Sequence, residues 1–86
     1  MRVMAKIAVP VESGNQGIKD GRIGKLIQAA AERWRPEAMY FGSFAGQRTA
    51  FMVVDLPDPS DMVAFSEPWF QELNADVEID PGDERR

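Results

Sequence analysis

Residues 39–56, MYFGSFAGQRTAFMVVDL, decide the fold. Two largely apolar, β-prone runs, Met39–Phe44 and Thr49–Leu56, flank the triplet Ala45-Gly46-Gln47. Two such runs joined by a short glycine-containing loop are typical of a β-hairpin. We therefore expect a hairpin at the middle of the chain, with the other elements on both sides of it.

The segment before the hairpin predicts a strand, a loop and a helix. Val3–Val9 is an apolar, β-branched run that Pro10 closes, as expected of a buried strand. Glu12–Gly24 contains four glycines among polar residues, and we expect a long ordered loop there. An apolar stripe at helical spacing begins at Ile23 and ends before Pro36, which predicts a helix.

The segment after the hairpin begins with the helix-start pattern Asp58-Pro59-Ser60-Asp61. Asp58 can cap the helix, Pro59 suits its first position, and Asp61 meets the free N–H groups there. Apolar residues then repeat at helical spacing as far as Leu73. Because Pro68 interrupts this pattern, we expect either a kink or two short helices.

The last predicted element is a strand with one wet face. Val77 and Ile79 alternate with three acidic residues at positions 76, 78 and 80. Residues 81–86 follow as a charged tail. We therefore expect one domain over residues 1–80 and a C-terminal tail over residues 81–86.

The predicted order is β-α-β-β-α-β, an α+β fold of the ferredoxin-like type. Its four-stranded sheet is of the antiparallel type, with both helices on one face. Apolar side chains nevertheless point to the other face as well. On the second strand of the hairpin these are Phe51 and Val53, which alternate with core residues, and on the first strand they are Tyr40 and Phe44. An exposed apolar face of this size predicts a homodimer that packs sheet to sheet, a dimeric α+β barrel.

Composition limits the chemistry. The 86 residues are 44 % apolar, carry a net charge of −4 and include neither cysteine nor histidine. The acidic balance and the lack of a basic cluster argue against a nucleic-acid partner. No apolar run reaches the roughly 20 residues that a membrane span needs, so we expect a cytoplasmic protein without a membrane partner. We expect no metal site and no cofactor, because the commonest ligands are missing.

Three side chains on the predicted open face form the first candidate site. Lys6, Tyr40 and Asp55 share that face by strand parity. Lys6 and Asp55 are expected on neighbouring, parallel strands, where they would form an ion pair with Tyr40 nearby. The group is either a structural ion pair in a dimer interface or the polar end of a ligand pocket, and Arg48 at the hairpin would rim such a pocket.

The glycine-rich segment is the second candidate. It lies between a strand and a helix, as a phosphate-binding loop does, but Lys19 stands where the first glycine of that motif belongs and Leu26 where its Ser or Thr belongs. The motif therefore fails. An anion held by backbone N–H groups at the start of the helix stays open as an interpretation.

The chain resembles a group of short, uncharacterised bacterial proteins in several segments. They are Pro10-Val11-Glu12-Ser13-Gly14-Asn15, Ile18-Lys19-Asp20-Gly21, Pro36-Glu37-Ala38-Met39-Tyr40-Phe41, Arg48-Thr49-Ala50, Glu67-Pro68-Trp69-Phe70 and Asn74-Ala75. More distantly, the pattern is similar to the dimeric α+β barrel superfamily, which includes cofactor-independent monooxygenases, muconolactone isomerases and stress-response barrels. The resemblance implies a fold and a dimer, and it implies no single activity.

These observations predict a homodimeric barrel protein that binds a small, largely apolar molecule. One alternative is a small cofactor-independent isomerase or monooxygenase that uses Lys6, Tyr40 or Asp55 for proton transfer. The lack of histidine weighs against it, because no side chain then titrates naturally near pH 7. A second alternative is a protein-interaction module, and whether the chain is an enzyme stays open.

Overall fold

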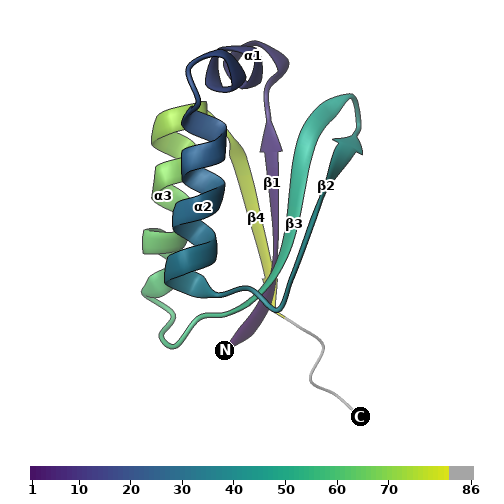
Figure 1. Cartoon of the computed structure of the whole chain (residues 1–86). Coiled ribbons are helices and arrows are strands. Elements are labelled where there is room, and N and C mark those ends of the chain that lie inside the picture. The colour runs from purple at the N-terminus through teal and green to yellow at the C-terminus, as the bar shows by residue number, and fades with distance from the viewer. Residues whose placement is uncertain (82–86) are drawn as a thin grey trace.

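The computed structural model describes residues 1–81 as two layers, a sheet and a pair of helices, with a third helix at one end (Figure 1). The elements in chain order are β1 (Arg2–Val9), α1 (Val11–Lys19), α2 (Arg22–Trp34), β2 (Ala38–Phe44), β3 (Gln47–Asp55), α3 (Asp61–Leu73) and β4 (Asp76–Pro81). The fold is α+β, as predicted, and it is close to the ferredoxin-like order with one helix added. Pro81 ends β4, and the rest of the expected tail, residues 82–86, lies outside the described residues.

The sheet has the order β2-β3-β1-β4, and every neighbouring pair is antiparallel. The predicted antiparallel-type sheet is confirmed, with β1 and β3 at its centre. The parallel pairing expected for the strands of Lys6 and Asp55 is wrong, because Lys6 lies opposite Phe51 and Asp55 lies opposite Arg2. Each crossover skips one strand, so the parallel pairs β1 with β2 and β3 with β4 are never neighbours.

The central hairpin is confirmed, and its turn is as short as a hairpin allows. Only Ala45 and Gly46 separate β2 from β3, with φ angles of 54° and 79°. Two consecutive residues in this left-handed region give the strands the twist that they need to pair. The tight turn fixes the register, so that Phe41 lies opposite Ala50 and Tyr40 lies opposite Phe51.

The core lies between the sheet and the helices α2 and α3 (Figure 1). Alternate residues of β1 and β3 point into it, and Ile7, Met52 and Val54 are fully buried there. From α3 come Phe65, Trp69 and Leu73, the apolar stripe that the sequence predicts. The strand parity and the helix stripes predicted from the sequence are therefore confirmed.

The predicted cap of α3 is wrong in position, because the helix begins at Asp61 and its N-cap residue Ser60 makes no side-chain cap hydrogen bond. Asp58 and Asp61 instead hold the turn that leads into the helix. The carboxylate of Asp58 accepts hydrogen bonds from the backbone N–H and the hydroxyl of Ser60, both at 2.9 Å. In return, the backbone N–H of Asp58 donates to the carboxylate of Asp61 at 3.1 Å. These reciprocal bonds fix the turn over residues 58–61 that leads into α3.

Pro68 lies inside a single helix, so the alternative of two short helices is wrong. Phe65 and Trp69 are buried on the same stripe before and after the proline, and this shared packing holds both halves in one helix. Proline has no N–H to donate to the carbonyl four residues earlier in the helix. Because Pro68 is exposed, water can hydrogen-bond to that carbonyl instead.

The long loop expected over Glu12–Gly24 is wrong, because α1 forms there and only Asp20 and Gly21 separate it from α2. The glycines of α1 serve close packing instead of flexibility. A Cβ on Gly17 would lie 2.8 Å from side-chain atoms of both Ile23 and Leu73. The helix is also fixed by the hydroxyl of Ser13, which donates to the carbonyl of Leu73 at 2.5 Å.

Within residues 1–81, no helix is both long enough and apolar enough to cross a lipid bilayer.

Candidate functional site

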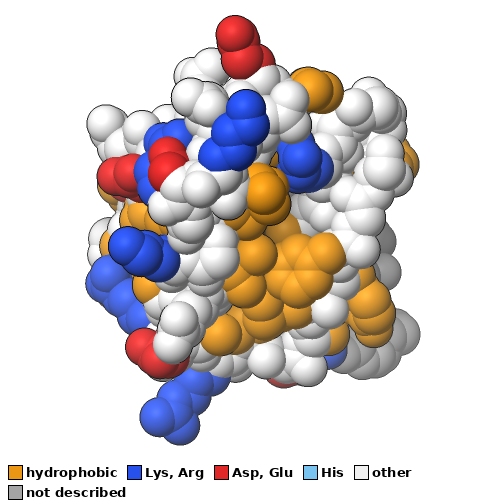
Figure 2. Space-filling model, turned by 45° about the horizontal axis from the view of Figure 1, so that its top comes forward, with side chains coloured by type: hydrophobic (Ala, Val, Ile, Leu, Met, Phe, Trp, Pro, Cys, Tyr) orange, Lys and Arg blue, Asp and Glu red, His pale blue; other side chains and the backbone are white. Residues whose placement is uncertain are grey.

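An apolar hollow opens between the helix-facing side of the sheet and α2 (Figure 2). Its volume is about 340 Å³. Apolar side chains fill the middle of this view, and no acidic side chain lies among them. The lining consists of Ile7, Val9, Ile23, Ile27, Phe41, Gly42, Arg48, Thr49, Ala50, Trp69 and Leu73.

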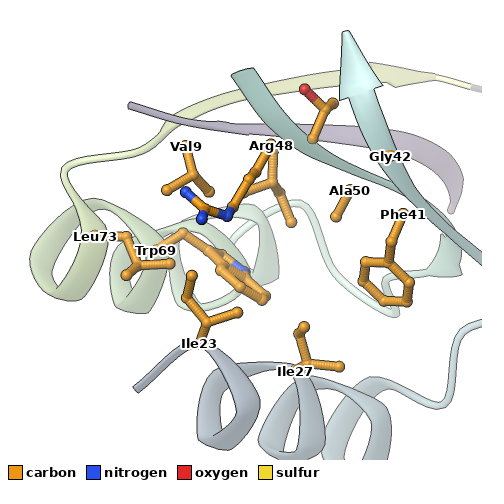
Figure 3. Close-up of a pocket in the computed structure, with 11 residues that line it drawn as sticks. Val9, Ile23, Ile27, Phe41, Gly42, Arg48, Ala50, Trp69 and Leu73 are labelled. Carbon is orange, nitrogen blue, oxygen red and sulfur yellow. The ribbon is translucent and has the colours of Figure 1, made fainter. Parts of the chain in front are cut away.

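The hollow exists because of a small residue between two large ones. Ala50 on β3 lies opposite Ile7 on one side and Phe41 on the other. Its methyl group leaves space that a larger side chain would fill. Phe41 is 55 % exposed on the helix-facing side of β2, where the helices do not cover it. Figure 3 shows Phe41 and Ile27 near each other at one end of the hollow, with Trp69 between them and Arg48.

Arg48 is the one charged residue in the lining. It shares the helix-facing side of β3 with Ala50, and its side chain reaches toward Val9 and Trp69 (Figure 3). The side chain has room because residue 14 is glycine, and a Cβ there would lie 2.7 Å from Nη1 of Arg48. The ion pairs among residues 1–81 involve Met1, Arg2, Lys6 and Arg22, and none involves Arg48.

The other residues predicted for the site lie on the opposite face of the sheet. Lys6 and Tyr40 share one row there, with Phe51 between them. The ammonium group of Lys6 lies 3.9 Å from a carboxylate oxygen of Glu78 and 4.4 Å from the ring centre of Phe44. Lys6 therefore forms an ion pair with Glu78 and a cation–π contact with Phe44, and the sequence indicated neither partner.

The ion pair expected between Lys6 and Asp55 is wrong. Asp55 lies at the far end of β3, where its carboxylate pairs with the amino group of Met1 at 2.8 Å. The antiparallel register separates the two residues, since Asp55 is opposite Arg2. Of the four residues predicted to bind a ligand, only Arg48 lines the hollow, and Lys6, Tyr40 and Asp55 do not converge on a site of their own.

The open face of the sheet is apolar, as the sequence predicts. Met4, Tyr40 and Phe44 are about half exposed or more on it, and Phe51 and Val53 are half-buried between them. We call these five residues the open-face patch. Along the β4 edge of this face run the acidic residues at positions 76, 78 and 80, all exposed. Within residues 1–81 no three such side chains come close enough together to hold a metal ion.

The start of α2 does not offer the anion site left open by the glycine-rich segment. The carboxylate of Asp20 already accepts a hydrogen bond from the backbone N–H of Arg22 at 3.0 Å and pairs with its side chain at 2.8 Å. The backbone N–H bond, followed by the side-chain contact, holds the pKa of Asp20 below its ordinary value. The protein's own carboxylate thus occupies this position.

Sequence reasoning missed most of the hollow, although a signal for it was present. Phe41 has the opposite parity from Tyr40 and Phe44 on the same strand, so it had to point to the helix side. Ala50 is the smallest residue of the β3 core row. An aromatic residue opposite an alanine at the uncovered end of a sheet predicts an unfilled space. Phe41 and Ala50 are such a pair.

Compared with known protein families and with curated protein sequences, the chain matches none. The resemblance to the uncharacterised bacterial group and to the dimeric barrels therefore stays a prediction from the segments that carry it.

Proposed function

We propose that this protein binds a small, largely apolar molecule in the hollow between the sheet and α2. The observation that carries the proposal is the apolar space of about 340 Å³ that the helices leave uncovered. Sites for small ligands commonly have volumes of about 300–1,000 Å³, apolar walls and few polar groups. The hollow has all three properties, with aromatic side chains from Phe41 and Trp69 in its wall.

We further propose that two copies associate through the open-face patch. Large exposed apolar patches are uncommon on monomers and usually mark interfaces. If β2 lies against β4 of the other copy, the acidic row on each β4 edge stays away from the row of its partner. The opposite arrangement, β4 against β4, would bring six carboxylates together and is disfavoured. Because the hollow is on the other side of the sheet, it stays accessible in such a dimer.

Binding is better supported than catalysis. The residues considered for proton transfer, Lys6, Tyr40 and Asp55, lie outside the hollow and apart from one another. A general acid or base has to reach the reacting group within hydrogen-bond distance, directly or through one water molecule. The isomerase or monooxygenase alternative has no such arrangement to support it.

The binding proposal can be tested with N-phenyl-1-naphthylamine, an uncharged fluorescent probe with an apolar body. We expect saturable binding with energy transfer from Trp69, retained when the other tryptophan is replaced by Trp34→Phe. Ala50→Leu should fill the hollow and abolish binding, whereas Ala29→Leu on the exposed side of α2 should not. Phe41→Ala provides a second test with little risk to folding, because Phe41 is 55 % exposed. Binding that neither Ala50→Leu nor Phe41→Ala weakens would contradict the proposal.

A further inference from the structure

We propose that the ligand is an amphipathic anion, a carboxylate on an apolar body, and that its charged group pairs with Arg48. The inference rests on the proposed function, since it names the class of molecule for the same hollow. It goes further because it assigns a charge, an orientation and a recognition residue.

The charges that line the hollow favour an anionic ligand. Its eleven lining residues include one cation, Arg48, and no carboxylate. Among residues 1–81 Arg48 forms no ion pair, which is also true of Lys19, Lys25, Arg33 and Arg35, but of these cations only Arg48 lines the hollow.

The position of the Arg48 guanidinium group also favours an anion. Arg48 is exposed, and its side chain extends along the hollow toward Val9 and Trp69 (Figure 3). Gly14 leaves the space that this path needs, because a Cβ there would lie 2.7 Å from Nη1 and 3.5 Å from Cδ. A guanidinium group offers a planar fork of N–H donors that matches a carboxylate.

The charged and the apolar parts of the lining lie at opposite ends of the hollow. The cation lies at the α1 end of the hollow, and the apolar side chains of Ile27 and Phe41 lie at its other end (Figure 3). A ligand that satisfies both ends has an acidic head and an apolar body. A neutral apolar ligand would leave the arginine unpaired, and an inorganic anion would leave the apolar walls in water.

The test compares two probes with the same body. 8-Anilinonaphthalene-1-sulfonate carries an anionic group that N-phenyl-1-naphthylamine lacks. We expect Arg48→Gln to weaken binding of the anionic probe roughly fivefold, the loss that follows from removing a charge pair that solvent partly screens. Binding of the neutral probe should change less than about twofold. Decanoate should displace the anionic probe from the wild-type protein more effectively than decan-1-ol does.

Lys6→Gln is the matched control, since it removes a cation next to the apolar patch on the other face. It should leave binding of both probes unchanged. If Lys6→Gln and not Arg48→Gln weakens the anionic probe, the anion binds at the open face and the inference is wrong. If Arg48→Gln weakens both probes equally, Arg48 shapes the hollow without recognising charge, and the inference fails while the proposed function stands. If the neutral probe does not bind at all, the proposed function fails and the inference fails with it.

Discussion

The guanidinium group of Arg48 lies in the space that a side chain on Gly14 would occupy. The two residues are far apart in the chain, on β3 and α1, and the distance from an added Cβ to Nη1 would be only 2.7 Å. The position of α1 over the end of the sheet and the path of the arginine along the hollow therefore depend on one missing methyl group.

Gly14→Ala should redirect Arg48 without unfolding the protein. Alanine favours a helix over glycine by roughly 0.5–1 kcal/mol. The closest contact of the new Cβ is with the flexible end of Arg48, and a tight contact of 3.2 Å with Cγ1 of Val9 offsets part of this gain. We expect the free energy of unfolding in urea to change little. Binding of 8-anilinonaphthalene-1-sulfonate should weaken several-fold, while binding of its uncharged analogue persists. Unchanged affinity for the anionic probe would mean that the position of the guanidinium group does not matter for binding.

Gly17→Ala and Gly24→Ala should have opposite effects on stability. A Cβ on Gly17 meets the packed side chains of Ile23 and Leu73 at 2.8 Å, and such overpacking costs about 1–3 kcal/mol. A Cβ on Gly24 meets nothing within 4 Å, so the helix gains roughly 0.5–1 kcal/mol. Urea denaturation of the two variants measures both changes. If both substitutions stabilise the protein, α1 does not pack as closely as the structure has it.

Phe44→Lys should dissociate the proposed dimer, and Phe70→Lys should not. Both phenylalanines are exposed, at 51 % and 40 %, but only Phe44 belongs to the open-face patch. A lysine there would bring a second positive charge next to Lys6, whose ammonium group now lies over the Phe44 ring. Sedimentation velocity at micromolar concentration should give a dimer for the wild-type protein and for Phe70→Lys, and a monomer for Phe44→Lys. A monomeric wild-type protein would exclude this assembly.

The carboxyl of Asp58, just before α3, should make the free energy of unfolding depend on pH under acidic conditions. Hydrogen bonds from the backbone N–H and then the hydroxyl of Ser60 hold the pKa of Asp58 below its ordinary value. A carboxyl whose pKa is lower in the folded protein contributes stability that is complete above its unfolded pKa. That contribution is lost as the pH falls through the folded pKa. We therefore expect Asp58→Ala to lower the urea midpoint at pH 7 and to have little effect below the folded pKa.

Ser60→Ala gives an independent check of the same contact. Removing the hydroxyl should raise the pKa of Asp58 toward its ordinary value, as followed by NMR titration of its carboxyl carbon. The backbone N–H bond is the larger cause of the low pKa, so the increase should be partial. A pKa that does not move would show that the hydroxyl does not donate to Asp58 in solution.

The strands and two of the helices could be predicted because the hydrophobic period of each segment agreed with the type of residue at its ends. Val3–Val9, the hairpin and the Asp58 helix start each combine a residue pattern with a matching end. Helix α1 escaped prediction because Gly14 and Gly17 lower helix propensity, and their compensation is a tertiary contact. The residues around these two glycines do not indicate that they pack closely against Ile23, Leu73 and Arg48.

The candidate site was predicted only in part, for a geometric reason. Strand parity placed Lys6, Tyr40 and Asp55 on the open face, but the register decides which of them meet, and the assumed parallel pairing gave the wrong partner. Arg48 was expected at a pocket, although on the same face as the others. The hollow lies on the helix side, where Phe41 and Ala50 were its signal in the sequence. How much of it stays open depends on how far α2 extends over β2, and no pattern in the sequence specifies that extent.

The two edges of the sheet differ in how they would receive another strand. The β4 edge carries three exposed carboxylates on one face and ends in Pro81, which has no N–H to donate. The β2 edge, AMYFGSF, has neither charge nor proline over its seven residues and exposes aromatic rings on both faces. Charges and prolines are the usual means by which sheets prevent unwanted pairing. Fibril growth from concentrated protein is therefore expected to begin at β2, and a lysine introduced at Ser43 should delay it more than one at any position of β4.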